Sequence, residues 1–183
     1  MIGLVSLLRQ LIKDAVELTR ARGLGKTPEP KNVVRQVATN DSFQLLTLVR
    51  LRERARRYHV PGLNHVLRRV MTAVYGLEVG NEVKLGDGID FVHPVGIVIG
   101  GDARVGDRVR FMGSNTVGTA KENGYPTIED DVTIGAGARI LGPIRVGRGS
   151  TIGANAVVIR DVPEGAIVTG IPGVARMPKE KPE

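Results

Sequence analysis

Residues 134–158, IGAGARILGPIRVGRGSTIGANAVV, decide the fold, because they repeat every six residues. An aliphatic residue stands at positions 134, 140, 146, 152 and 158, and glycine follows three of these five. Short strands joined by tight corners need an inward aliphatic residue followed by a small one. A six-residue period of this kind is typical of a parallel β-helix.

The same spacing extends toward the N-terminus in shorter runs. Within each run the large apolar residue recurs at intervals of six, which predicts that all of these side chains point into one continuous core. The inward positions are Val79, Leu85 and Phe91; Ile99, Val105, Phe111 and Val117; Ile128, Ile134, Ile140, Val146, Ile152 and Val158.

The period is interrupted twice. It slips by two residues between Phe91 and Ile99, across His93, and it slips again where residues 119–127, TAKENGYPT, enlarge one corner. Functional sites tend to be grafted where a regular scaffold is interrupted. His93, one of three histidines in the chain, is therefore the first candidate for a functional side chain.

The first part of the chain has a helical period instead. It predicts helices over residues 1–22, 39–60 and 64–75, with a linker over residues 23–32 and Gly76 as the terminating residue. The apolar run at the start is broken by charged residues, so we expect a helix there and no signal peptide. The predicted fold is mainly β, with an α-helical region over 1–76, a β-helix domain over 77–176 and a disordered tail over 177–183.

Composition excludes several classes of function. The chain has no cysteine, which excludes disulfides, thiolate catalysis and cysteine-based zinc sites and is compatible with a cytoplasmic location. Only one histidine lies in the repeat region, so we expect no metal. Residues 1–76 carry a net charge of +9, interpreted as a solvated helical face, and the scarcity of aromatic residues argues against nucleic acid. Peripheral contact with an anionic membrane remains an alternative for this charge.

Residues 93–118, HPVGIVIGGDARVGDRVRFMGSNTVG, and residues 134–176 resemble the hexapeptide-repeat acyltransferases. Within them the resemblance is to the serine acetyltransferase-like group, which includes the colanic-acid-type O-acetyltransferases. It implies a left-handed parallel β-helix with three hexapeptides per coil, an exception to the usual right-handed crossover. It also implies a homotrimer with active sites between subunits and acetyl-CoA as co-substrate.

The resemblance assigns His93 the role of general base, which takes the proton from the acceptor hydroxyl as that oxygen attacks the thioester. The family places an aspartate 15 residues before this histidine. Here that position is Glu78, which is therefore expected to orient the imidazole, with Asp90 and Asp87 as fallback candidates.

The resemblance also implies cofactor-binding residues. A backbone N–H at Gly118 is expected at the reacting end, and Ala136 and Ala154 are expected along the pantetheine arm, where small side chains let it lie flat. The cofactor phosphates need cations. The candidates, which the sequence does not rank, are Lys121, Arg148, Arg160 and Arg176.

Four positions depart from the serine enzymes. Val92, Gly101, Gly124 and Tyr125 stand where the family has polar or charged residues that hold the amino acid. Without these partners the charges of serine would be poorly compensated, which predicts a wider acceptor pocket. The expected function is therefore O-acetylation of a saccharide or secondary-metabolite hydroxyl, with Tyr125 as one wall of the pocket, in a role such as polysaccharide biosynthesis.

Three alternatives remain at this point. One is a serine O-acetyltransferase of cysteine biosynthesis with an atypical acceptor pocket. A second is an N-acyltransferase acting on an amino sugar, which uses the same machinery. The third is non-enzymatic: a trimeric scaffold whose basic helices bind anionic surfaces.

Overall fold

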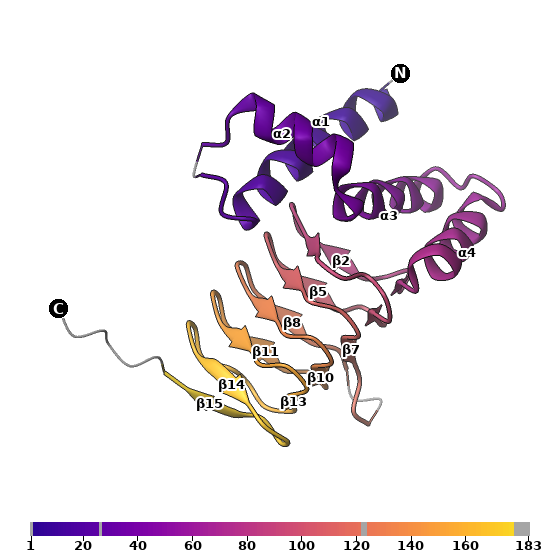
Figure 1. Cartoon of the computed structure of the whole chain (residues 1–183). Coiled ribbons are helices and arrows are strands. Elements are labelled where there is room, and N and C mark those ends of the chain that lie inside the picture. Colours follow the sequence, from indigo (N-terminus) through magenta and orange to yellow (C-terminus); the bar gives the residue numbers. More distant parts are fainter. Residues whose placement is uncertain (1, 26, 122–123, 178–183) are drawn as a thin grey trace.

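The computed structural model describes residues 2–25, 27–121 and 124–177. Four helices come first and pack at one end of a stack of parallel coils, as Figure 1 shows. The helices are α1 (Ile2–Ala21), α2 (Pro30–Thr39), α3 (Asp41–Arg57) and α4 (Leu63–Tyr75).

Local signals explain where the helices begin and end. The Asn40 side chain accepts a hydrogen bond from the Ser42 N–H at 2.9 Å and caps α3, and α4 ends at Gly76, whose φ is +62°. Helix α2 corrects the predicted linker, which extended to residue 32. Pro30 is the first residue of α2. Proline is favourable there, because the N–H that it lacks would have no hydrogen-bond partner in the first turn of a helix.

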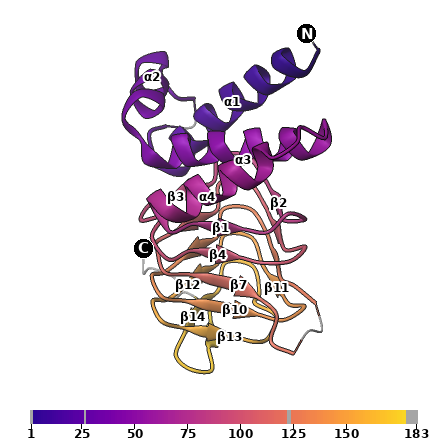
Figure 2. The same cartoon turned by 90° about the vertical axis from the view of Figure 1, so that its right-hand side faces the viewer.

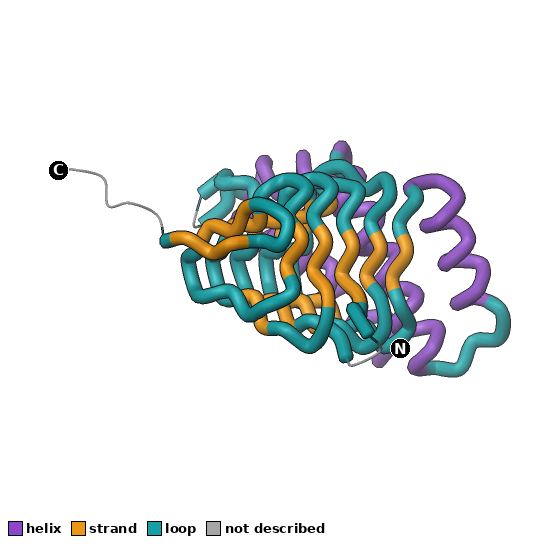
Figure 3. Tube along the Cα trace, turned by 90° about the horizontal axis from the view of Figure 1, so that it is seen from below, coloured by secondary structure: helices purple, strands orange, loops and turns teal. Residues whose placement is uncertain are grey.

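Each coil from β1 to β12 contributes one short strand to each of three sheets, and β13 and β14 extend two of these sheets (Figures 2 and 3). The sheet orders are β1-β4-β7-β10-β13, β2-β5-β8-β11 and β3-β6-β9-β12-β14-β15. The strands are β1 (Glu78–Val79), β2 (Lys84–Leu85), β3 (Asp90–Phe91), β4 (Val98–Ile99), β5 (Arg104–Val105), β6 (Arg110–Phe111), β7 (Thr116–Gly118), β8 (Thr127–Ile128), β9 (Thr133–Ile134), β10 (Arg139–Leu141), β11 (Arg145–Val146), β12 (Thr151–Ile152), β13 (Val157–Val158), β14 (Ile167–Thr169) and β15 (Val174–Arg176).

The core of the coils confirms the six-residue pattern. All thirteen predicted inward residues are buried, none more than 8% exposed. They stack in register from coil to coil, so that Val79 pairs with Ile99 and Ile99 with Val117, while the rings of Phe91 and Phe111 stack at 5.7 Å. All strand pairs between coils are parallel, and β15 returns antiparallel to cover the edge of β14.

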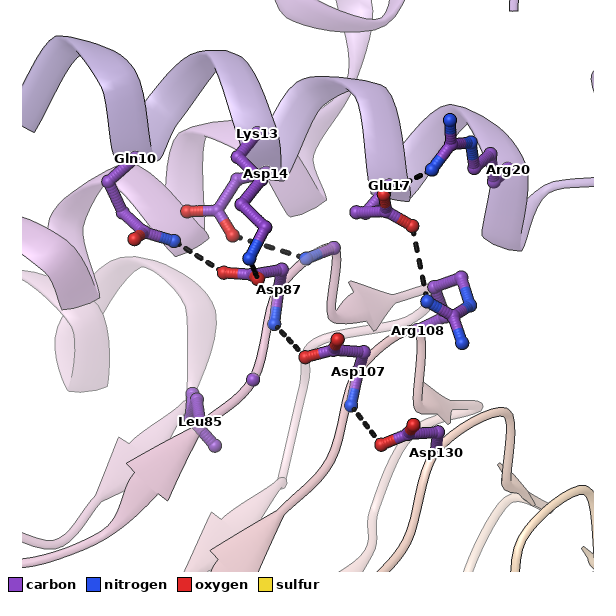
Figure 4. Close-up of polar contacts among 12 residues, drawn as sticks. Gln10, Lys13, Asp14, Glu17, Arg20, Leu85, Asp87, Asp107, Arg108 and Asp130 are labelled. Atoms are coloured by element: carbon purple, nitrogen blue, oxygen red, sulfur yellow. Dashed lines mark hydrogen bonds and ion pairs between the residues drawn. The ribbon is translucent and has the colours of Figure 1, made fainter. Parts of the chain in front are cut away.

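Charged groups join the helices to the first coil (Figure 4). Asp14, fully buried on α1, accepts two hydrogen bonds from Arg50 of α3 at 2.9 and 3.0 Å and a third from the Gly88 N–H at 3.1 Å. Burial raises the pKa of the nearby Asp87 carboxyl, but hydrogen bonds from Lys13 and Gln10 outweigh it, so that pKa lies below its ordinary value. The helices are thus fixed to the first coil by hydrogen bonds and by the Lys13–Asp87 ion pair, as well as by apolar contacts.

From this junction, aspartates continue down one corner of the coils. The Asp87 N–H donates to Asp107 at 2.8 Å, and the Asp107 N–H donates to Asp130 at 3.0 Å (Figure 4). Each carboxylate therefore satisfies a turn amide of the preceding coil.

Two searches of the described residues gave negative results. None of the described helices is long and apolar enough to cross a membrane. No group of three or more metal-ligating side chains occurs in that part of the chain. Most of the predicted tail, residues 178–183, lies outside the described residues.

Candidate active site

His93 lies at the corner between β3 and β4 and is exposed. The chain turns here from one sheet to the next. The two extra residues between Phe91 and Ile99 lengthen this turn, which includes Gly96 at φ +74°. The slip in the repeat therefore turns the imidazole outward. A solvent-accessible imidazole is free to exchange a proton with a substrate.

The same corner in the following coils holds the predicted cofactor-lining residues. Gly113 lies against His93 one coil further on: a Cβ built at Gly113 would be 2.7 Å from the His93 carbonyl oxygen. The Gly113 carbonyl accepts from the Gly137 N–H at 2.9 Å, and the Ala136 carbonyl accepts from the Asn155 N–H at 2.9 Å. These contacts place His93, Gly113, Ala136 and Ala154 in one column along the corner.

This column has a chemically simple surface beyond the histidine. Ala136 and Ala154 are both exposed and carry only methyl groups. An extended ligand arm lying along Ala136 and Ala154 would meet only methyl groups at these two positions, in the same column as the His93 imidazole. The residues therefore fit the predicted pantetheine arm, although their role as cofactor ligands stays a prediction.

Glu78 begins β1, is exposed and forms an ion pair with Arg68 of α4 at 3.6 Å. Among the described residues no recorded contact joins Glu78 to His93, so its orienting role stays a prediction. The fallback candidates are engaged elsewhere. Asp90 is fully buried and binds Arg22 at 2.8 Å, whereas Asp87 takes part in the contacts with α1.

The other predicted cofactor residues do not share this corner. Gly118 ends β7, where its carbonyl accepts from the Gly142 N–H at 2.9 Å. Lys121 is exposed in the enlarged corner, next to residues outside the description. Arg148 lies between β11 and β12, paired with Asp130 at 3.0 Å. Their roles stay predictions.

Of the four predicted acceptor residues, Tyr125 and Gly101 are in contact. A Cβ at Gly101 would fall 2.1 Å from Tyr125 Cε2, so the tyrosine ring occupies the space that a side chain at position 101 would take. Gly124 lies close to Pro143, and the Val92 N–H is bonded to the Phe111 carbonyl at 2.9 Å. The missing side chain at Gly101 therefore leaves no opening at that point.

Comparisons with known proteins show what the chain is similar to. The family described as "Bacterial transferase hexapeptide (six repeats)" matches residues 125–160. A serine acetyltransferase of Synechococcus elongatus is 35% identical over 151 residues, covering 81% of this chain and 62% of that protein. A serine acetyltransferase of Bacillus licheniformis is 48% identical over 101 residues, covering 54% of this chain and 47% of that protein.

The chain is serine acetyltransferase-like. Solved structures agree. The serine acetyltransferase of Neisseria gonorrhoeae in complex with serine superimposes with a TM-score of 0.78 at 26% identity, covering 93% of this chain and 69% of that one. A serine acetyltransferase in complex with CoA gives a TM-score of 0.80 at 26% identity, covering 93% and 70%. This serine acetyltransferase-like chain spans only 47% to 62% of the two curated relatives.

The comparisons overturn the predicted acceptor. A saccharide or secondary-metabolite hydroxyl, and with it polysaccharide biosynthesis, was inferred from the missing polar groups; it is wrong, because the relatives at 35% and 48% identity are named serine acetyltransferases. Neither a glycan acceptor nor a membrane contact finds support. The physical reason lies in Tyr125, which fills the space above Gly101. Loss of polar side chains at this site did not create a wider pocket there.

Two residues near the His93 corner of this serine acetyltransferase-like chain, Asn115 and Arg139, were not predicted from the sequence. Asn115 is fully buried and contacts two turns of the His93 corner. Arg139 donates to the carbonyl of Ser114 and, at 3.1 Å, to that of Gly137. A signal for Asn115 existed, because an amide stands there two residues before an inward valine, where the other coils carry aliphatic residues.

Proposed function

We propose that this protein is a serine O-acetyltransferase, which transfers the acetyl group of acetyl-CoA to the hydroxyl of L-serine. The names of the curated relatives and the likeness to complexes with serine and with CoA support the proposal. The observation that carries it is that the exposed His93 and the small residues Ala136 and Ala154 lie in one column along the same corner of successive coils.

In the proposed reaction, His93 accepts the proton of the serine hydroxyl while that oxygen forms a bond to the thioester carbonyl carbon. The carbon–sulfur bond then breaks, and His93 returns the proton to the departing thiolate, so that charge and protons balance. The chain's part is to hold the imidazole outward and within reach of the hydroxyl. Glu78 is proposed to orient the ring, and the Gly118 N–H to stabilise the developing oxyanion.

The acceptor site is proposed to include Val92, Gly101, Gly124 and Tyr125. Because these residues lack formal charge, the carboxylate and ammonium of serine must be held by other groups. Support for Tyr125 comes from its half-buried ring, which packs on Gly101 and against the core of the coils. A fixed ring is a suitable wall for a small substrate.

The protein is further proposed to act as a homotrimer with active sites between subunits. Support comes from apolar side chains exposed on α4 and near the first coil, which a second copy would cover. These residues are Leu63, Val66, Val70, Val74, Val95 and Val98. Light scattering of the purified protein should give a mass three times the 19.6 kDa of the chain, and a monomer would contradict the proposal.

The function is tested by incubating the protein with acetyl-CoA and a panel of acceptors and following free thiol with a colorimetric reagent. The chain has no cysteine and contributes no background. The panel contains L-serine, sugars, sugar nucleotides and amino sugars. We expect thiol release with L-serine alone, abolished in His93→Ala. Release with a sugar and none with serine would refute the proposal.

A further inference from the structure

One inward column of the coils contains a single polar residue. Two positions before each core residue of the sheet that starts with β1, the chain places another inward side chain, and every one of these is fully buried. The column reads Leu77, Ile97, Asn115, Ala138 and Ala156. A buried amide is unfavourable unless it is hydrogen-bonded. The other coils fill this position with leucine, isoleucine or alanine, so the fold does not require a polar side chain there.

The amide of Asn115 joins two coils. Its Oδ1 accepts a hydrogen bond from the Gly113 N–H at 3.0 Å, and its Nδ2 donates to the Gly135 carbonyl of the next coil at 2.7 Å. Both partners are backbone groups of turns at the His93 corner. Gly135 directly precedes Ala136, the first residue of the proposed cofactor strip.

The turn at Gly113 packs directly against the main chain of His93. A Cβ at Gly113 would lie 2.7 Å from the His93 carbonyl oxygen and 3.1 Å from the His93 Cβ, so the two main chains are in close contact. The turn holds two successive residues with positive φ, Gly113 at +111° and Ser114 at +51°. Such a conformation is unfavourable for serine and needs external support, which the amide of Asn115 and the guanidinium of Arg139 supply.

We propose that Asn115 is a positioning residue, which fixes the Gly113 turn and thereby sets the spacing between His93 and the Ala136 strip. The contacts run from the His93 main chain to Gly113, through the Asn115 amide, to the Gly135 carbonyl beside Ala136. This inference rests on the proposed function, because the spacing matters only if His93 acts on a ligand bound along that strip. Displacing a base by a fraction of an ångström is enough to reduce the rate of a proton transfer.

The test uses Asn115→Ala and Asn115→Val, because the same column accepts alanine at positions 138 and 156. The matched control is Ser150→Ala. Ser150 is also an inward polar residue two positions before a core residue. It is fully buried, and its hydroxyl has no hydrogen-bond partner among the described residues. It lies between β11 and β12, away from the His93 corner.

Four quantities are measured for each variant: kcat for L-serine, KM for L-serine, the thermal midpoint, and the NMR signals of the His93 imidazole over a pH series without substrate. We expect kcat of both Asn115 variants to fall about tenfold while KM for L-serine changes less than about twofold. The His93 signals should shift and the folded state should persist. Ser150→Ala should match the wild type in kcat and in the His93 signals.

The outcomes separate the two proposals. If the wild type transfers acetyl to L-serine and the Asn115 variants keep its kcat with unmoved His93 signals, the positioning role is refuted. If the wild type shows no histidine-dependent transfer to L-serine, the proposed function fails, and the NMR signals alone decide whether Asn115 fixes His93. A variant that loses kcat together with its folded state, with alanine as well as valine, would show that Asn115 is only structural.

Discussion

Substituting Gly113 by alanine should impair the reaction more than the fold. A methyl group at Gly113 would lie 2.7 Å from the His93 carbonyl oxygen, whereas non-bonded heavy atoms prefer about 3.5 Å, so the two main chains must separate by up to about 0.8 Å. An error of about 1 Å in a catalytic group lowers the rate roughly 100-fold. We therefore expect kcat for L-serine to fall about 10- to 100-fold. The positive φ of +111° adds a backbone cost of roughly 1–2 kcal/mol.

Gly165→Ala separates these two effects. Gly165 also has a positive φ, +67°, but a Cβ there would meet nothing within 4 Å. It should lose about 1–2 kcal/mol of unfolding free energy and keep wild-type kcat. Both variants are compared by steady-state kinetics and by urea unfolding at one temperature. The reasoning is refuted if Gly113→Ala keeps wild-type kcat, or if the two variants lose activity equally.

Three further predictions concern stability. Asp14→Ala should lose about 3–5 kcal/mol in urea unfolding, since it removes the buried carboxylate that pairs with the buried guanidinium of Arg50. Lys13→Ala, whose ammonium group is exposed, should lose less than about 1 kcal/mol, and equal losses would contradict this. Ser150→Ala should gain about 1 kcal/mol of unfolding free energy, because it removes a buried hydroxyl that has no hydrogen-bond partner within the described part of the chain, and a loss in the same assay would count against that view. The pKa of Asp87 is depressed in the folded state, so the ionised carboxylate stabilises the fold above its unfolded pKa of about 3.9, and this stabilisation is lost as pH falls below that value. Asp87→Asn should therefore flatten the fall of the thermal midpoint below about pH 4, and a pH profile equal to that of the wild type would contradict this.

The period of the sequence was sufficient to predict the coils. Each inward residue is determined by local spacing, since a side chain six positions on returns to the same side of the next strand; residues such as Ile134 and Ile140 needed no long-range information. The slip across His93 likewise located the exposed corner. Helix α2 was missed because the prolines before it were assigned to a linker, although Pro30 is favourable in a first helical turn.

The contacts around His93 could not be predicted in the same way. They join residues of different coils, and the six-residue period tells which residues point inward but not which turn an inward amide reaches. Asn115 bonds to Gly135 only because the coils stack in one register. The acceptor pocket was misjudged for a related reason: the side chains missing at positions such as Gly101 were counted, but the Tyr125 ring that fills this space comes from the enlarged corner of the next coil.

The most direct test of the central claim is mass-spectrometric detection of O-acetylserine formed from acetyl-CoA and L-serine by the wild type and by His93→Ala. Loss of a general base lowers a rate by roughly 100- to 10,000-fold. The account predicts rapid product formation by the wild type and a fall in kcat/KM of at least about 100-fold in the variant, with its fold retained. Product formation at an equal rate in both proteins, or no product in either, would contradict it.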